Sequence, residues 1–248
     1  MDDEQSVQEE EYAFPYHYLP RAEHGDFRWW PYWAWGYRYL SGIELVLDEL
    51  ARLEPKTLVD IGCGDGRFLK EAARRLSSAQ LLGIDYSDRA IRLAQALNPE
   101  VHYVAADITG ALAIGTFDAV TLIEVLEHVP PAQVPSFVEG MKRLMHSQSA
   151  LIVTVPHKNQ ALIEKHYQHF DATSLELALG EHFKLERLFY FDRRCRAVTL
   201  WQRLLFNRYF VIRHQRLLNY MYRRYRAKYL RCTERDCERM GAVFRVVQ

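Results

Sequence analysis

Short apolar runs that alternate with helical stretches fill the middle of this 248-residue chain. The runs are apolar on both faces, which is typical of a parallel sheet covered by helices on each side. The alternation predicts a doubly wound, seven-stranded α/β sheet, with helices near 67–76, 88–97 and 132–146. The predicted strands are Thr57–Ile61, Leu81–Ile84, Val101–Val104, Ala119–Ile123, Leu151–Val155, Phe183–Phe191 and Ala242–Val247.

The composition divides the chain into five segments. Residues 1–11 carry six acids and few apolar side chains, so we expect a disordered acidic tail. Residues 12–53 combine twelve aromatic side chains and three prolines with a final helical pattern, which predicts an aromatic cap and a leading helix. We assign residues 54–192 to the core, 193–240 to a helical insert and 241–248 to the final strand of the core.

Cysteine use and hydropathy predict a cytoplasmic protein. The four cysteines form no CxxC pair, so we expect reduced thiols and no structural zinc. No run approaches the ~18 apolar residues that a membrane span requires. The acidic amino end is also unlike the basic start of a signal peptide.

Charge is unevenly distributed although the net charge is zero. Residues 193–231 hold twelve basic side chains and no acid, so the other 209 residues have an excess of twelve acids. Apolar residues recur every seven positions in this segment, which predicts one or two amphipathic helices. The charge predicts a phosphate-bearing partner, either an anionic membrane surface that holds the protein peripherally or RNA. Helices that only face solvent are the third interpretation.

The sequence VDIGCGDG follows the first predicted strand and opens a helix. Gly62, Gly64 and Gly66 permit tight turns and a close approach of a ligand to the backbone beside Cys63. Phosphate-binding loops use GxGxxG, but here the third glycine comes one residue early. Asp60, before the turn, would repel a pyrophosphate and can pair with an ammonium group. The loop therefore favours a cationic ligand over a dinucleotide.

Two further carboxylates end the next predicted strands. Asp85 lies 23 residues after the first glycine of the loop, the spacing at which a carboxylate binds ribose hydroxyls. Asp107 can accept a hydrogen bond from an adenine amino group, and Tyr86 and Ile108 offer apolar faces to the ring. An adenosyl ligand fits this crevice.

The ordered set VDIGCGDG, GIDYS, AADI and FDAVTLIEVLEH resembles the class I S-adenosylmethionine-dependent methyltransferases, from about Thr57 to Val155. The resemblance implies a Rossmann-like methyltransferase sheet with S-adenosyl-L-methionine as cofactor. In such a sheet the glycine loop faces the methionine moiety, Asp85 holds the ribose, and Asp107 and Ile108 hold adenine. Glu124 falls where this family lines the edge of the cofactor.

The EVLEH turn predicts the catalytic residues. Glu124, Glu127 and His128 have i, i+3, i+4 spacing and share one face of a helical turn at the mouth of the sheet. Methyl transfer to oxygen needs a base, so we assign His128 as general base, with Glu127 beside it. The expected acceptor is a small or lipid-linked hydroxyl compound, such as a sugar or a quinone-like intermediate. A purely capping or packing role for His128 is the alternative.

The same face admits a metal-dependent alternative. Glu124, Glu127 and His128, joined by His169 or by the nearby His166, offer mixed oxygen and nitrogen ligands to a divalent metal. This arrangement resembles the small-RNA 2′-O-methyltransferases, although the residues after the distal histidine differ. A non-catalytic cofactor-binding module that docks on membrane or RNA is a further hypothesis. The sequence leaves the oligomeric state open.

Overall fold

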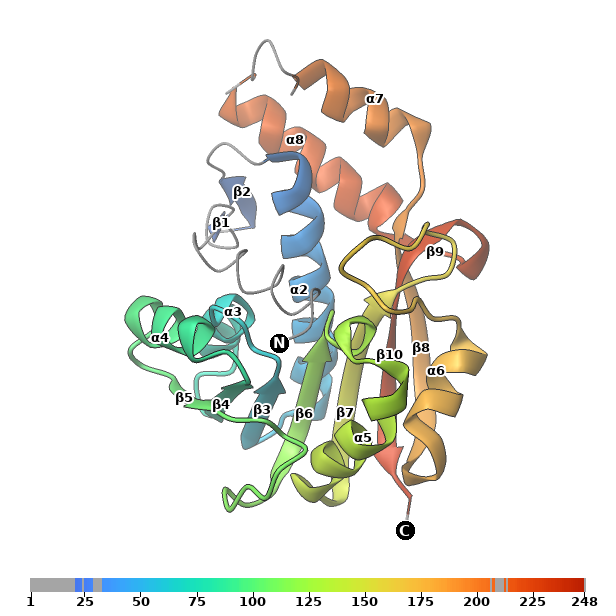
Figure 1. Cartoon of the computed structure of the whole chain (residues 1–248). Coiled ribbons are helices and arrows are strands. Elements are labelled where there is room, and N and C mark those ends of the chain that lie inside the picture. The colour runs from blue at the N-terminus through green and yellow to red at the C-terminus, as the bar shows by residue number, and fades with distance from the viewer. Residues whose placement is uncertain are drawn as a thin grey trace.

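An eight-stranded sheet forms the centre of the computed structural model, which describes residues 21–23, 25–28, 33–205, 207, 212 and 214–247. The strand order is β5-β4-β3-β6-β7-β10-β8-β9 (Figure 1). β3 to β7 pair in parallel, whereas β10 is antiparallel to both of its neighbours, β7 and β8. The strands are β3 Thr57–Ile61, β4 Gln80–Asp85, β5 His102–Ala105, β6 Phe117–Ile123, β7 Met145–Pro156, β8 Phe183–Arg193, β9 Arg231–Cys232 and β10 Cys237–Val246.

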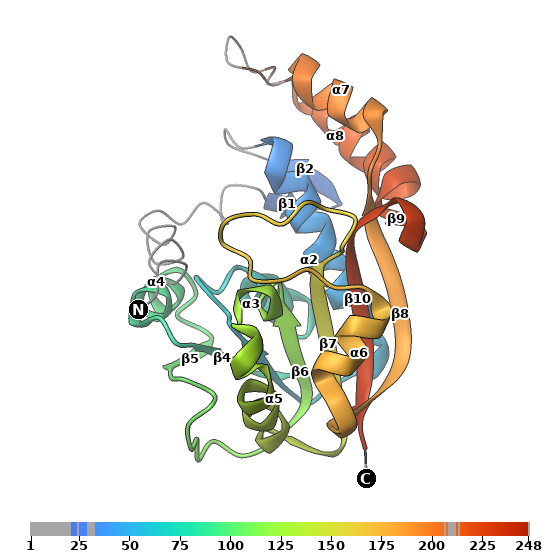
Figure 2. The same cartoon turned by 45° about the vertical axis from the view of Figure 1, so that its right-hand side comes forward.

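Helices cover both faces of the sheet (Figure 2). On one face, α2 (Trp33–Leu53), α3 (Arg67–Arg75), α4 (Asp88–Leu97) and α8 (Gln215–Tyr225) bury their apolar stripes in one core. On the other face, α5 (Val134–Arg143) and α6 (Ala172–Leu179) enclose a second core. Local sequence fixes several helix starts, because Ser87 caps α4 and Asp171 forms a capping box on α6.

The predicted doubly wound α/β fold is confirmed, with one difference in strand number. The eighth strand, β9, has only two residues and pairs with the end of β8 at the edge of the sheet. No alternation of apolar residues marks so short a strand, so the sequence gives no signal for it. The chain leaves β8 after Arg193 and returns at Cys237, so the final strand begins five residues before the predicted Ala242.

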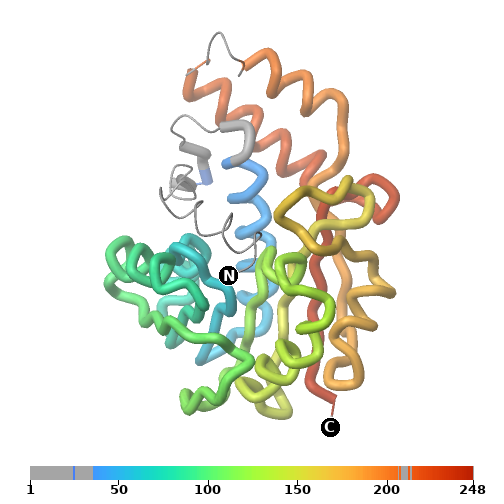
Figure 3. Tube along the Cα trace, viewed as in Figure 1, coloured from blue at the N-terminus to red at the C-terminus, as the bar shows by residue number. Residues whose placement is uncertain are grey.

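Between β8 and β10 the chain forms α7 (Arg196–Leu205), α8, a π-helical turn η5 (Arg226–Leu230) and β9. α8 packs on α2, where the ring centroids of Tyr37 and Tyr225 are 4.7 Å apart. The Nε2 amide of Gln202 on α7 also donates a hydrogen bond of 3.0 Å to the Tyr37 hydroxyl. The segment from 194 to 236 is thus anchored on the helix that precedes the core (Figure 3).

At the amino end, the structure describes a short hairpin of β1 (Arg21–Glu23) and β2 (Asp26–Arg28). The predicted tail at 1–11 and the first part of the predicted aromatic cap lie outside the described residues. Within the described ranges, none of the helices has the length and apolar character that a membrane crossing needs.

Candidate active site

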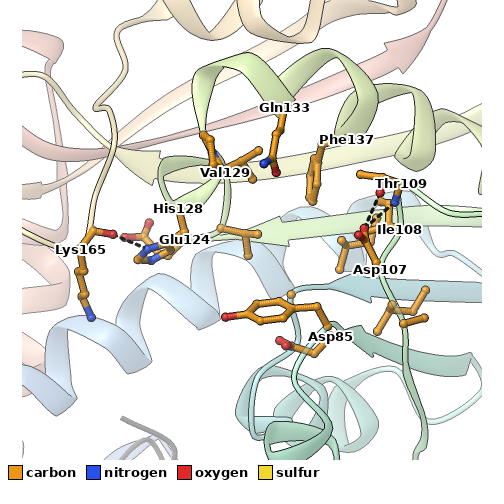
Figure 4. A pocket seen from close by; sticks show the side chains of 17 residues that line it. Asp85, Asp107, Ile108, Thr109, Glu124, His128, Val129, Gln133, Phe137 and Lys165 are labelled. Atoms are coloured by element: carbon orange, nitrogen blue, oxygen red, sulfur yellow. Dashed lines mark hydrogen bonds between the residues drawn. The ribbon is translucent and has the colours of Figure 1, made fainter. Parts of the chain in front are cut away.

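One pocket lies at the carboxyl ends of the parallel strands, where ligands bind in sheets of this class (Figure 4). The turns that follow β3, β4, β5 and β6 contribute to it, together with the start of α5 and the segment around residue 165. It is lined by Ile61, Gly62, Ile84, Asp85, Tyr86, Ala106, Asp107, Ile108, Thr109, Glu124, Val125, His128, Val129, Pro130, Gln133, Phe137 and Lys165.

The three glycines of the loop after β3 all have positive φ angles. A Cβ atom on Gly62 would lie 2.5 Å from a methyl group of Val125, and one on Gly66 would lie 2.4 Å from the hydroxyl of Tyr103. The side chains of neighbouring elements occupy this space. At these two positions glycine is therefore required both by the backbone conformation of the turn and by the close packing of neighbouring side chains. The sequence interpretation included only the first requirement and the approach of a ligand.

Asp85 and Asp107 end adjacent strands and project into the pocket. The carboxylate of Asp85 accepts hydrogen bonds of 2.9 Å from the backbone N–H groups of Gly64 and Ser87. That of Asp107 accepts bonds of 2.8 Å from both the N–H and the hydroxyl of Thr109. These contacts fix both carboxylates before any ligand arrives.

An apolar wall lies beside the two carboxylates. Ile108 and Phe137 are nearly buried, belong to the same hydrophobic core and both line the pocket (Figure 4), whereas Tyr86, which also lines it, is 47% exposed. A flat aromatic ring fits between such side chains. The sequence predicted Tyr86 and Ile108, but Phe137, on the helix after the EVLEH turn, was missed because it reads as an ordinary core residue of α5.

Four predicted cofactor residues, Asp60, Cys63, Gly64 and Gly66, do not line the pocket. Asp60 accepts a 2.6 Å hydrogen bond from the hydroxyl of Thr121, and burial raises the pKa of its carboxyl to about 7. Cys63 is buried against Gly83, and burial together with the nearby carboxylates raises its thiol pKa. Both side chains lie behind the loop and support it from within the sheet.

On the other side of the pocket, Glu127, His128 and His166 form a polar cluster, in which one ligand atom from each residue lies within 4.8 Å of the others. The sequence proposed His169 or His166 as the distal histidine, and the structure brings His166 to the cluster. Glu127 is 1% exposed, and its Oε2 atom has no hydrogen-bond partner among the described residues. Burial, with a contribution from Glu124, raises the pKa of Glu127 well above its ordinary value.

Backbone carbonyls set which ring nitrogens of the cluster carry lone pairs. His128 Nδ1 lies 2.8 Å from the carbonyl oxygen of Lys165, to which only a protonated nitrogen can donate, so Nε2 carries the lone pair. His169 holds His166 in the same way, since its Nδ1 faces the carbonyl of Gln160 at 3.3 Å and its Nε2 lies 2.8 Å from His166 Nδ1. His166 Nε2 then also carries a lone pair.

The charge state of His166 is fixed by its surroundings. Burial, together with the neighbouring rings of His128 and His169, lowers the pKa of this ring to about 3. A neutral imidazole and a carboxyl with a raised pKa therefore lie together in this cluster.

Glu124 lies between the two sides of the pocket, in a left-handed backbone conformation with a φ of 55°. Its Oε2 atom accepts a 2.8 Å hydrogen bond from Nε of Arg239, which also pairs with Asp192 at 2.8 Å. Asp192 in turn pairs with Arg38 of α2 and accepts a hydrogen bond from the Tyr225 hydroxyl of α8. The last strand, the leading helix and the insert thus together hold one strained residue of the pocket.

Comparison with known sequences adds to this geometry. A family model described as a methyltransferase domain matches residues 58–148. Residues 58–148 are thus similar to class I S-adenosylmethionine-dependent methyltransferase domains. Over 119 residues the chain is 37% identical to a ubiquinone biosynthesis O-methyltransferase of Cupriavidus pinatubonensis, a match that covers 46% of each protein. It is 41% identical over 120 residues to the protein of that name from Ralstonia nicotianae, covering 46% of this chain and 48% of the relative. The chain thus spans about half the length of these relatives.

Solved structures share the fold of the methyltransferase domain. The N-methyltransferase NodS from Bradyrhizobium japonicum, solved with S-adenosylhomocysteine, superposes with a TM-score of 0.63 at 15% identity and covers all of both chains. The magnesium protoporphyrin IX methyltransferase of Synechocystis, also with S-adenosylhomocysteine, gives a TM-score of 0.57 at 16% identity over 87% of this chain and 86% of its own. The methyltransferase domain of bacterial CtHen1-C gives 0.59 at 14% identity over 85% and 100%.

The family predicted from the sequence and its cofactor are therefore confirmed for the methyltransferase domain. Most predicted cofactor residues meet in one pocket, and the EVLEH turn lies at its edge. The pairing of Arg239 with Glu124 could not be predicted, because the two residues are more than a hundred positions apart and nothing in the sequence distinguishes Arg239 from the other charged residues of the final strand. The role of the Lys165 carbonyl could not be predicted either, because every residue has a backbone carbonyl and the residue type does not show which one accepts a hydrogen bond.

Proposed function

We propose that this chain is an S-adenosylmethionine-dependent O-methyltransferase that acts on a hydroxyl group of a small or lipid-linked acceptor. The observation that supports the proposal is that one pocket combines a side suited to the cofactor with a side that offers a base. One side has anchored carboxylates and apolar side chains, and the other has a histidine whose Nε2 carries a lone pair. The printed names of the relatives, ubiquinone biosynthesis O-methyltransferases, support the choice of oxygen as the acceptor atom.

The donor set fits the cofactor. Asp85 would hold the ribose hydroxyls, while Asp107 would accept from the adenine amino group with Ile108 and Phe137 against the ring. Glu124 lies between this half and the acceptor half, with its carboxylate held by Arg239. When bound, S-adenosylmethionine supplies an electrophilic methyl group. The chain contributes binding, orientation and proton transfer.

His128 would act as the general base. Its Nε2 lone pair would take the proton of the acceptor hydroxyl, and the carbonyl of Lys165 would keep Nδ1 protonated throughout. Glu127 lies beside the ring and stabilises the imidazolium once the proton has moved. Base catalysis of this kind contributes about 10²- to 10⁴-fold to a rate.

The acceptor class follows from the pocket and the relatives together. The wall of the pocket is largely apolar, with Val129, Pro130 and Phe137 near the catalytic turn. A quinone-like ring or a lipid-linked compound suits such a wall better than a free sugar does. We therefore favour a phenolic hydroxyl of a quinone-like intermediate.

The test is transfer of a labelled methyl group from S-adenosylmethionine to fractionated lysate by the purified protein. We expect label in an organic-soluble fraction, attached through a methyl ether. Label confined to RNA would instead support the second candidate below. Cofactor binding without transfer to any fraction would overturn the enzyme proposal and leave a cofactor-binding module.

The second candidate is a metal-dependent methylation of an RNA ribose 2′-hydroxyl. Its support is the composition of the polar cluster, because a buried Glu127 oxygen without a hydrogen-bond partner and two imidazole lone pairs lie together. Such a set of acceptors fits a divalent cation bound by Glu127, His128 and His166. When bound, a cation would polarise the ribose hydroxyl. Glu124 is held away by Arg239 in this arrangement, so it does not belong to the ligand set.

Metal binding separates the two candidates. Titration of the chelator-treated protein with Mn²⁺ in a calorimeter should show one site in the wild type and none in the His166→Ala variant if the cluster holds metal. His102→Ala, which changes an exposed histidine of β5, is the matched control. Full methyl transfer after exhaustive chelation, with no Mn²⁺ binding, would exclude the metal-dependent candidate and leave His128 as the base.

A further inference from the structure

The insert forms a hairpin of two helices, α7 and α8, at one end of the molecule (Figures 1 and 2). The parallel strands point their carboxyl ends toward this same end, so the pocket also opens on that side of the sheet (Figure 1). A partner that binds the hairpin would therefore lie at the same end of the molecule as the pocket.

Each helix of the hairpin buries one face and exposes apolar side chains on the other. In α7, Val198 and Leu205 are buried, whereas Leu200 and Leu204 are 55% and 57% exposed. These leucines are four residues apart and so lie on the same face. In α8, Leu218 and Tyr222 are buried and the exposed positions are Leu217 and Tyr220. Exposed leucines on successive turns of a helix are costly in water and suggest a partner.

The exposed faces also carry arginines that no acid neutralises. Arg196, Arg203 and Arg216 are exposed and form no ion pair with any residue of the described ranges. Other arginines of the segment do pair, since Arg193 contacts Asp236 and Arg226 contacts Glu44. The unpaired charges are thus concentrated on the faces that expose the leucines.

We propose that the exposed faces of α7 and α8 dock on an anionic phospholipid surface. Arginines among leucines on an amphipathic helix match the negative headgroups and the apolar boundary beneath them. RNA is the less suitable partner, because Tyr222 and Tyr225 are buried and Trp201 is covered by Arg224 and Tyr229. Few rings therefore remain to stack on bases.

Docking on a membrane extends the proposed function. It rests on that function in one respect, which is that the acceptor is lipid-linked. An acceptor that resides in a bilayer reaches the pocket when the hairpin holds the protein at the surface with the carboxyl ends of the strands toward it. The binding itself needs no methyl transfer, so its test is independent of the enzyme assay.

The experiment is cosedimentation of the full chain with vesicles of phosphatidylcholine alone or mixed equally with phosphatidylglycerol. We expect binding to the mixed vesicles only, and weaker binding as salt rises. Replacing Arg196, Arg203 and Arg216 together with glutamine should weaken it about 100-fold. The double variant Leu200→Ser, Leu204→Ser should weaken it about tenfold through lost apolar burial.

Matched controls come from elsewhere on the surface. Glutamine at Arg52, Arg74 and Arg92 removes three exposed charges, and Leu177→Ser changes a leucine that is 81% exposed on α6. These controls should bind vesicles like the wild type, and all variants should keep the wild-type unfolding temperature. Equal binding to both vesicle types, no binding, or tighter binding to a single-stranded oligouridine than to the mixed vesicles would each overturn the proposal.

Discussion

The cofactor half of the pocket takes its polar groups from consecutive turns after β3, β4 and β5, whereas the acceptor half takes them from segments far apart in the chain. Asp107 is anchored by Thr109 and Asp85 by Ser87, each two residues away, and Asp85 is also anchored by the backbone N–H of Gly64 in the turn after β3. His128 and Glu124 instead depend on Lys165 and Arg239. The cofactor half is thus a property of local motifs, and the acceptor half is a property of the assembled fold. Each prediction below tests that difference.

The largest effect is expected in the acceptor half. His128→Ala should lower kcat by about 10²- to 10⁴-fold, because it removes the proposed base, while cofactor affinity stays within a factor of two. Single-turnover methyl transfer and calorimetry measure the two quantities. His102→Ala serves as the control on an exposed histidine. Retention of kcat in the His128 variant would contradict its role as base.

A second effect tests the long-range support of Glu124. Arg239→Gln should lower the free energy of unfolding by about 1–3 kcal/mol, since it leaves two carboxylates without their shared partner in a largely buried network. Arg245→Gln on the same strand breaks an exposed pair with Glu186 and an exposed hydrogen bond to the Gln148 carbonyl, and should cost less than about 1 kcal/mol. Denaturant unfolding compares the two. Equal losses would show that the Arg239 network is no more than a surface pair.

The third prediction concerns the affinity of the cofactor half of the pocket for S-adenosylhomocysteine. Asp85→Ala should weaken S-adenosylhomocysteine binding by about 10- to 100-fold, as charge-assisted hydrogen bonds to the ribose disappear. Asp88→Ala, three residues further on at an exposed site, should bind as the wild type does. Calorimetry with both variants measures the ratio. Unchanged affinity in the Asp85 variant would refute the ribose assignment.

The last prediction concerns the pH dependence of stability and rests on Asp60, whose carboxyl has a pKa of about 7 because it is buried. Its pKa is raised in the folded state, so the folded protein binds a proton that the unfolded chain releases near pH 4, and stability falls as pH rises from about 4 to 7. Asp60→Asn removes this titration. The variant should gain up to about 1.4 kcal/mol over the wild type per pH unit in that window. Parallel stability curves for the two proteins would contradict the buried-carboxyl interpretation.

Much of the fold could be predicted because its signals are local. Strands β3 to β7 are continuous apolar runs, and the glycine loop marks the first turn at the carboxyl edge of the sheet. The two-residue strand β9 could not be predicted, since it exists only where the insert passes beside the end of β8. The placement of Asp60 was also out of reach, because the sequence shows a carboxylate before the loop but not the Thr121 hydroxyl that holds it.

The sequence by itself determined the sheet, the order of its turns and the carboxylates at the strand ends, because each depends on periodicity or spacing within a few residues. Only the tertiary structure decided that His166 joins Glu127 and His128, and that Arg239 holds Glu124. Those choices depend on where distant parts of the chain, the loop between β7 and α6 and the strand β10, return to the sheet edge. The physical reason is that a side chain at a distant position gains its chemical role from its neighbours in space, and the residue type alone does not record them.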